Sequence, residues 1–183
     1  MILASASPQR RGILTSLGVE FSAVASDVEE VDEGPAAVVA RENALRKAVA
    51  VHGKGGGVVL GVDTVAALEL ELWGKPPSAD AARETLRALS GRVHSVVSGF
   101  AVVGPDGVVA GDDTTLVEFR SLDDATIDWY VGSGEWEGRA GGYAIQGRGG
   151  ALVRRIEGDY LNVVGLPLAA IIERCPDLLG FGS

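Results

Sequence analysis

The chain of 183 residues has few of the side chains on which disulfides, zinc sites and covalent catalysis depend. Cys175 is the only cysteine, which excludes an intramolecular disulfide. His52 and His94 are the only histidines, and neither stands in a metal-ligand spacing or beside a nucleophile pattern. The sequence lacks an apolar run of the roughly 18 residues that span a bilayer, and its start lacks a basic lead and a cleavable apolar segment. We therefore expect a cytoplasmic protein with no membrane partner.

Positive charge is also scarce. The sequence has 16 lysines and arginines against 25 aspartates and glutamates, which gives a net charge of −9 and a pI near 4.7. A field of that sign repels DNA and RNA, because their binding depends on neutralising phosphates. We therefore expect no nucleic-acid partner. A small phosphorylated ligand stays compatible with this charge if a local basic pocket or a metal supplies positive charge.

Apolar residues make up 46% of the sequence, which is enough to build the core of one domain over residues 1–183. Short apolar runs alternate with stretches of helical periodicity, a pattern that favours an α/β fold with a mixed central sheet and flanking helices. We expect strands at 2–4, 19–24, 58–62, 93–103, 108–119 and 152–156, a hairpin at 65–73, and helices at 8–17, 36–51, 79–89, 122–131 and 168–174.

The start of the first expected helix is a candidate phosphate site. Ser7 followed by Pro8 has the chemistry of an N-cap and a first helical position, and the free N–H groups of a helix start attract anions. Ser5 and Arg10 add a hydroxyl and a guanidinium to that site. The alternative is an ordinary capped helix with Arg10 and Arg11 in solvent.

Asp63 and Thr64 directly follow the apolar run 58–62. If that run is a strand that ends there, both residues stand at the carboxyl end of a strand, where open α/β sheets bind ligands. A carboxylate at that place can hold a divalent metal or act as a general base toward water. The alternative is an aspartate that forms a turn.

Lys47, Lys75 and Gln146 are further candidates for contacts to a nucleotide. Lys47 lies on the longest expected helix, and Lys75 precedes a proline that fixes the direction of the backbone. Each lysine suits a phosphate as a point charge, with surface solvation as the alternative. Gln146 lies in the glycine-rich segment 140–147 and offers a donor and an acceptor to a base edge, with a flexible surface loop as the alternative.

Taken together and in order, several segments resemble the Maf family of nucleoside triphosphate pyrophosphatases. They are Leu3 to Pro8, Lys47-Ala48, Gly61 to Thr64, Gly74 to Pro76, Leu89 to His94, Ala140 to Gly147, Gly158 to Tyr160 and Val164 to Leu168. Each motif is weak alone, but the resemblance covers nearly the whole chain. It implies a fold like that of Maf proteins and inosine triphosphatases, with two lobes around a cleft.

The resemblance also implies a reaction, the hydrolysis of a nucleoside triphosphate to a monophosphate and pyrophosphate with a divalent cation, Mg²⁺ or Mn²⁺. Asp63 matches the family's catalytic residue, the base that takes a proton from water. Glu30 matches an acidic position where, together with Asp63, we expect the metal. The residues that match phosphate-binding positions are Ser5, Arg10, Lys47 and Lys75.

By the same resemblance, substrate choice depends on three positions. Thr64 and Gln146 match the branch that acts on dTTP and UTP, whereas a branch that prefers methylated guanosine triphosphate differs at both. The dTTP/UTP branch usually has arginine directly after Ser-Pro, where this chain has Gln9. Loss of that charge is expected to weaken phosphate binding or to broaden the base choice. Modified nucleotides stay open as substrates. Arg11 is the cation that we expect to substitute for it in part.

Two alternatives stay open. One, also linked to the family, is a nucleotide-binding regulator of cell division with little turnover, but the joint presence of Asp63, Lys47, Lys75 and Glu30 favours turnover. The other is a nucleic-acid binder, which the net charge of −9 disfavours. A homodimer is compatible with the family, although the sequence has no diagnostic interface.

Overall fold

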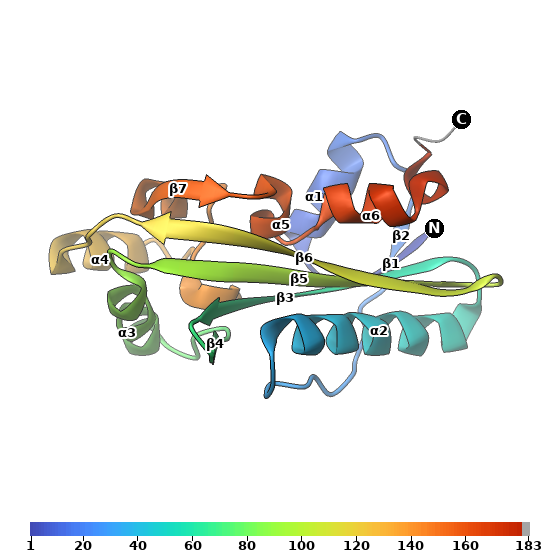
Figure 1. Cartoon of the computed structure of the whole chain (residues 1–183), viewed down its shortest axis with the longest axis horizontal. Coiled ribbons are helices and arrows are strands. Elements are labelled where there is room, and N and C mark those ends of the chain that lie inside the picture. The colour runs from blue at the N-terminus through green and yellow to red at the C-terminus, as the bar shows by residue number, and fades with distance from the viewer. Residues whose placement is uncertain (181–183) are drawn as a thin grey trace.

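The computed structural model describes residues 1–180 and has a seven-stranded sheet with helices on both faces (Figure 1). The strands are β1 (Ile2–Ala4), β2 (Ser22–Ala23), β3 (Val59–Leu68), β4 (Glu71–Trp73), β5 (Val93–Gly104), β6 (Gly107–Phe119) and β7 (Val153–Glu157). Their order is β2-β1-β3-β5-β6-β7, with β4 paired to β3. Strand β1 runs parallel to β2 and β3, and the other pairs are antiparallel. This confirms the expected mixed sheet with flanking helices.

The α-helices of residues 1–180 begin at residues that can cap them or preset their first turn. They are α1 (Pro8–Ser16), α2 (Ala36–Gly55), α3 (Ala79–Leu89), α4 (Asp124–Val131), α5 (Tyr160–Val164) and α6 (Leu168–Arg174). The Ser7 hydroxyl accepts a hydrogen bond from the Arg10 amide at 3.4 Å, and Asp123 accepts one from the Thr126 amide at 2.8 Å. Such caps satisfy amide groups that the helix itself leaves free.

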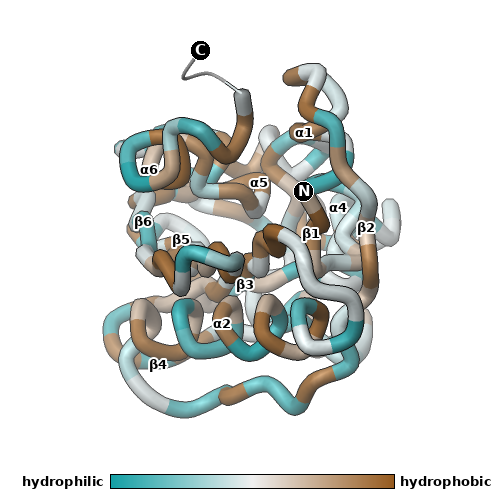
Figure 2. Tube along the Cα trace, turned by 90° about the vertical axis from the view of Figure 1, so that its right-hand side faces the viewer, coloured by the Kyte–Doolittle hydropathy of each residue, from teal (hydrophilic) through white to brown (hydrophobic). Residues whose placement is uncertain are grey.

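Helix α2 packs against one face of the sheet, and α1, α5 and α6 cover the other (Figures 1 and 2). Two strand glycines allow α2 to come this close. A Cβ atom on Gly99 would lie 2.3 Å from the backbone of Ala40, and one on Gly61 would lie 2.1 Å from the carbonyl oxygen of Ala44. Because no larger residue fits at either place, the glycines set the depth at which α2, and with it Lys47, lies over β3.

The buried apolar side chains form separate clusters along the sheet. One cluster, with Leu86, Phe119 and Tyr130, joins α3 and α4 to the far ends of β3, β5 and β6. At the other end of the sheet, one cluster contains α1 and α6 side chains and another contains α2 side chains. The two ends of the sheet therefore have separate apolar clusters. The two lobes around a cleft that the resemblance implies stay a prediction.

The observed elements differ from the sequence-based prediction mainly at β3. The sequence predicted a strand at 58–62 and a separate hairpin at 65–73, but one strand runs from Val59 to Leu68 before the turn to β4. Asp63 pairs with Gly99 and Thr64 with Ser98 in β5, so the ladder continues across the polar pair. The prediction that Asp63 and Thr64 follow the end of a strand is therefore wrong.

Smaller differences concern the ends of elements. Helix α2 extends to Gly55 rather than residue 51, and the strand expected at 19–24 is limited to Ser22–Ala23. Helices α3 and α6 have the predicted bounds. No helix within residues 1–180 combines the length and the apolar character that crossing a membrane requires. The last three residues of the expected domain, 181–183, lie outside the described residues.

Candidate active site

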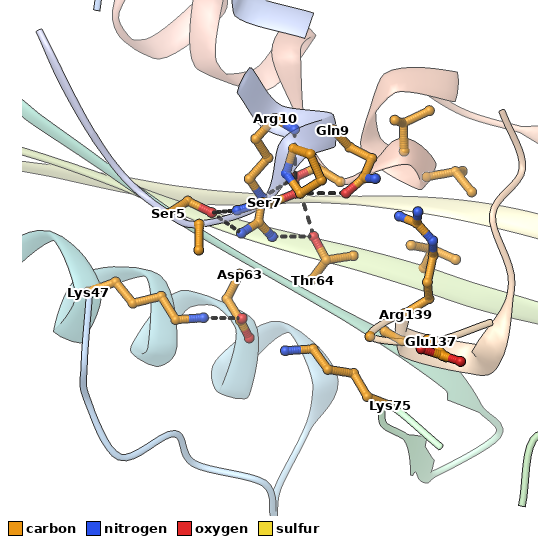
Figure 3. A pocket seen from close by; sticks show the side chains of 18 of the residues that line it. Ser5, Ser7, Gln9, Arg10, Lys47, Asp63, Thr64, Lys75, Glu137 and Arg139 are labelled. Atoms are coloured by element: carbon orange, nitrogen blue, oxygen red, sulfur yellow. Dashed lines mark hydrogen bonds and ion pairs between the residues drawn. The ribbon is translucent and has the colours of Figure 1, made fainter. Parts of the chain in front are cut away.

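A pocket of about 450 Å³ opens between the start of α1, the middle of β3, helix α2 and the segment 137–146 (Figure 3). All nine residues that the sequence proposed for binding or catalysis line it: Ser5, Gln9, Arg10, Glu30, Lys47, Asp63, Thr64, Lys75 and Gln146. They come from separate parts of the chain, so the fold brings the proposed residues together. The roles that the resemblance assigns to them stay predictions.

The charges around the pocket differ in sign from the charge of the whole chain. Four cations line the pocket, namely Arg10, Lys47, Lys75 and Arg139. Three carboxylates also line it, those of Glu30, Asp63 and Glu137. The pocket thus has a small excess of positive charge in a chain of net charge −9. A local excess of this kind suits a small anion better than a long polyanion.

Lys47 joins the two carboxylates of the predicted metal site. Its Nζ lies 2.6 Å from Asp63 Oδ1 and 2.5 Å from Glu30 Oε1. The side chains of Lys47 and Asp63 are 10% and 9% exposed, whereas that of Glu30 is 42% exposed. Burial of an isolated charge is costly, so each of the two buried partners depends on the other.

Asn43 holds the second oxygen of Asp63, and the sequence gave no role to this residue. Its Nδ2 donates to Asp63 Oδ2 at 3.2 Å and to the carbonyl of Val31 at 2.8 Å. Its Oδ1 accepts from the Val31 amide at 2.7 Å. Asn43 therefore ties the acidic loop around Glu30 to Asp63. Asn43 and Lys47 are four residues apart, so both lie on one face of α2. This spacing is the sequence signal that could have identified Asn43 as a residue of the site.

Arg10 is buried and forms hydrogen bonds to three different protein groups. Its Nε donates to the Gly165 carbonyl at 2.7 Å, one terminal nitrogen donates to Ser5 Oγ at 3.1 Å, and the other donates to Thr64 Oγ1 at 3.0 Å. Burial lowers the pKa of Arg10, against the opposing effects of Asp63 and Glu30. Arg10 thus connects the start of α1 to β3 and has few N–H groups left for a ligand.

Thr64 has its side chain fixed by neighbours on two elements. Its hydroxyl accepts from Arg10 and lies 2.8 Å from the Ser98 hydroxyl. Ser98 Oγ in turn donates to the carbonyl of Asn162 at 3.2 Å. This chain of hydrogen bonds gives Thr64 one orientation at the wall of the pocket.

The residue at the predicted arginine position, Gln9, is held within the first turn of α1. Its Oε1 accepts from the Ser7 hydroxyl at 3.1 Å. Arg11, which the sequence offered as a partial substitute, is exposed and is not among the residues that line the pocket. That expectation is wrong because Arg11 leaves α1 on a different side from the pocket-lining Arg10.

The glycine-rich segment is ordered by a buried aromatic cluster that the sequence did not reveal. Gly141 and Gly142 have φ of +67°, which few other residues adopt, and they lead into Tyr143, which lines the pocket. The hydroxyl of Tyr143 lies 2.9 Å from His94 Nε2. Burial lowers the pKa of His94 to about 4 and raises that of Tyr143, so both are neutral near pH 7. Gln146 is exposed at the pocket's edge.

The two carboxylates that contact Lys47 have the oxygen ligands that a hard divalent cation prefers. Glu30 and Asp63 bring two carboxylates to the same point, and no group of three or more histidine, cysteine or acidic side chains suited to a metal exists within residues 1–180. Mg²⁺ is commonly held by one or two carboxylates plus waters and substrate phosphates. The two carboxylates therefore suit an ion that the protein and a phosphate-bearing ligand bind jointly.

Comparison with known proteins identifies the family. The family model described as Maf-like protein matches residues 1–176. A dTTP/UTP pyrophosphatase of Pyrococcus furiosus is 41% identical, covering 94% of this chain and 92% of its own, and one of Thermococcus onnurineus is 43% identical, covering 100% and 98%. A solved structure from Mycobacterium abscessus, described as a nucleoside-triphosphatase / dITP/XTP pyrophosphatase, is 23% identical with a TM-score of 0.48, over 64% of this chain and 73% of that chain. By the family match and the two identities, this chain belongs to the Maf family.

Proposed function

We propose that the chain hydrolyses nucleoside triphosphates, with dTTP and UTP as preferred substrates, to the monophosphate and pyrophosphate. The observation that carries the proposal is the buried Asp63 carboxylate in a pocket with an excess of cations. A general base beside several cations suits attack on the phosphoanhydride of a nucleoside triphosphate, whose negative charge must be stabilised. The names of the Pyrococcus and Thermococcus relatives support the choice of substrate.

In the proposed reaction, a water oxygen attacks the α-phosphorus while Asp63 takes one of the water's protons. The bond from the α-phosphorus to the bridging oxygen breaks, and pyrophosphate leaves with the bonding electron pair. Lys47 and Asn43 each engage one oxygen of Asp63, and each oxygen keeps a second lone pair to accept the proton. The two contacts fix the direction of the carboxylate, so catalysis depends largely on positioning.

The predicted cofactor is Mg²⁺ or Mn²⁺, held by Glu30 and Asp63 with the phosphates. When bound, such an ion lowers the pKa of its water and neutralises phosphate charge. Lys75, which lines the pocket from the loop after β4, is proposed to bind phosphate as a point charge. Ser5 and Arg10 support this function by fixing the start of α1 and Thr64.

Base recognition is proposed for Gln146. Its amide has a donor and an acceptor, which match the edge of a pyrimidine base, and it lies at the exposed edge of the pocket. The fixed hydroxyl of Thr64 is the second specificity position. A cytoplasmic location, a homodimer and the absence of a nucleic-acid partner stay predictions from the sequence and its resemblance.

The test is a panel of canonical and modified triphosphates with Mg²⁺, Mn²⁺ or a chelator, in which pyrophosphate and orthophosphate are measured separately. We expect pyrophosphate from dTTP and UTP, a loss of activity with the chelator, and a loss in Asp63→Asn. Asp106→Asn is the matched control, because Asp106 is an exposed aspartate in the turn between β5 and β6. It should leave the rate unchanged.

Other outcomes have definite meanings. Orthophosphate as the first product would show attack at the terminal phosphate and a different reaction class. Nucleotide binding without turnover across the panel would support the regulatory alternative. Equal rates for purine and pyrimidine triphosphates would contradict the proposed roles of Thr64 and Gln146.

A further inference from the structure

The cations of the pocket are not equally available to a ligand. Arg10 donates from all three of its nitrogens to protein oxygens. Lys47 is engaged by the two carboxylates of Asp63 and Glu30. Within residues 1–180, no carboxylate lies within ion-pair distance of Lys75 or Arg139. A triphosphate carries about four negative charges, so these two uncommitted side chains matter most for its binding.

Arg139 is anchored in a way that leaves its terminal nitrogens directed into the pocket. Its Nε donates to the backbone carbonyl of Glu135 at 3.1 Å, and the side chain is half-buried. Among the described residues, the two terminal nitrogens have no protein acceptor. Figure 3 shows the guanidinium extending from the segment 137–140 toward the start of α1, where Gln9 lies. An anchored guanidinium loses little freedom when it binds the paired oxygens of a phosphate.

The start of α1 itself lacks a free cation. Gln9 is neutral and accepts from Ser7, Arg10 is engaged, and Arg11 is exposed outside the pocket. The start of α1 therefore offers an anion no uncommitted cation from its own helix. Of the two arginines that line the pocket, Arg139 is the one whose terminal nitrogens have no protein acceptor within residues 1–180.

We propose that Arg139 binds a phosphate group of the substrate and supplies, from the segment 137–140, the positive charge that Gln9 does not provide. The proposal rests on the proposed function for the identity of the substrate. Both side chains line the same pocket, so an arginine at position 9 should restore the phosphate binding that is lost when Arg139 is replaced. Glu137 also lines the pocket, and its negative charge would oppose a phosphate at this segment if Arg139 were absent.

The experiment compares the wild type with Arg139→Gln, Arg139→Lys and the double variant Gln9→Arg/Arg139→Gln. Two quantities are measured, the steady-state constants for dTTP and the Kd for inorganic tripolyphosphate by calorimetry. Loss of one charge-assisted contact should raise KM and the tripolyphosphate Kd about 10-fold to 100-fold in Arg139→Gln. Arg139→Lys should retain part of the affinity as a point charge, and the double variant should regain most of it.

Arg148→Gln is the matched control. Arg148 follows the same segment and is exposed, and it does not line the pocket, so both constants should stay at their wild-type values. Thermal unfolding of every variant shows whether a loss of affinity comes from a loss of fold.

The outcomes separate this proposal from the proposed function. Unchanged tripolyphosphate binding in Arg139→Gln overturns the role of Arg139, whether or not dTTP is hydrolysed. Weakened binding in Arg139→Gln that the double variant restores supports it even if the wild type hydrolyses no triphosphate. Weakened binding that Gln9→Arg fails to restore overturns the exchange of charge between the two positions. A wild type that binds no tripolyphosphate overturns the proposal as a whole.

Discussion

The ammonium group of Lys47 lies 2.6 Å from Oδ1 of Asp63 and joins helix α2 to the middle strand of the sheet. The same group contacts Glu30 in the acidic loop, so one cation holds together two carboxylates from different elements. Removal of the cation leaves Asp63 buried without its counter-charge. The contact thus connects the stability of the fold to the proposed chemistry.

Replacement of Lys47 by methionine should therefore reduce both stability and activity. We expect the free energy of unfolding to fall by about 3 kcal/mol, because breaking a buried pair leaves an uncompensated charge. We expect kcat/KM for pyrophosphate release to fall about 100-fold, as when one preorganised donor is lost. Urea unfolding and steady-state assays measure the two effects.

A double variant separates the two effects of Lys47. Lys47→Met combined with Asp63→Asn removes both buried charges and should recover part of the lost stability while activity stays absent. Lys54→Met is the control, because Lys54 is exposed near the end of α2. If the double variant is no more stable than Lys47→Met, the buried pair is not the cause of the stability loss.

Asn43 is expected to act as a positioning residue for Asp63. Asn43→Ala leaves the Val31 amide and carbonyl without their partner, which should lower the free energy of unfolding by about 1–2 kcal/mol. Because Asp63 also loses a contact, kcat should fall about 10-fold with a smaller change in KM. Asn43→Asp, although close in shape, should be less active than Asn43→Ala because it places a second carboxylate beside Asp63.

Glu42→Gln serves as the control for Asn43. Glu42 is the preceding residue on α2 and forms a half-exposed pair with Arg46, away from the pocket lining. It should change neither kcat nor stability measurably, since exposed ion pairs contribute little. Wild-type activity in Asn43→Asp would show that Asp63 does not depend on the Asn43 contact.

The sequence predicted most elements from local signals, and it predicted nine of the residues that line the pocket from local chemistry together with the family resemblance. The N-cap and proline at the start of α1, and the glycine turn between β5 and β6, depend on residues close to one another in the chain. The order of short motifs along the chain predicts the pocket residues Asp63, Lys47 and Lys75. These signals need no knowledge of packing.

The remaining features depend on contacts between distant parts of the chain. Strand β3 continues past Asp63 because this residue pairs with Gly99 and the residues after it pair with β5. The hydrophobic pattern of β3 alone does not reveal this pairing. The His94–Tyr143 contact spans 49 positions, and Arg139 reaches the pocket only because of the fold of the segment 137–146. Tertiary placement, rather than residue type, gives these side chains their roles.

Gly99→Ala tests the close packing of α2 on the sheet. The new Cβ would meet the backbone of Ala40 at 2.3 Å, so the helix must move or the strand must bend. We expect a loss of about 1–3 kcal/mol in the free energy of unfolding and reduced activity, because α2 holds Lys47 and Asn43. Gly53→Ala on the same helix meets nothing within 4 Å and should be neutral or stabilising. Equal stabilities of the two variants would contradict this account of α2.

Acid should destabilise the protein in part through His94. Burial lowers its pKa to about 4 from an ordinary value of 6.5, so between these values the unfolded chain binds a proton that the folded protein does not. The free energy of unfolding should therefore fall as the pH drops from 6.5 toward 4, by up to about 3 kcal/mol from this residue, and the effect should level off below pH 4. Above pH 6.5 His94 is neutral in both states and contributes no pH dependence.

Urea unfolding at pH 7 and pH 4.5 measures this effect in the wild type, His94→Gln and His52→Gln. Glutamine at position 94 retains a group that can bond to the Tyr143 hydroxyl but does not titrate, so His94→Gln should lose less stability on acidification than the wild type. His52 is only half-buried, near the end of α2, and His52→Gln should keep the wild-type pH dependence. The carboxylates titrate alike in all three proteins, so their contribution cancels. The same loss of stability in His94→Gln as in the wild type would mean that carboxylates alone cause the acid sensitivity.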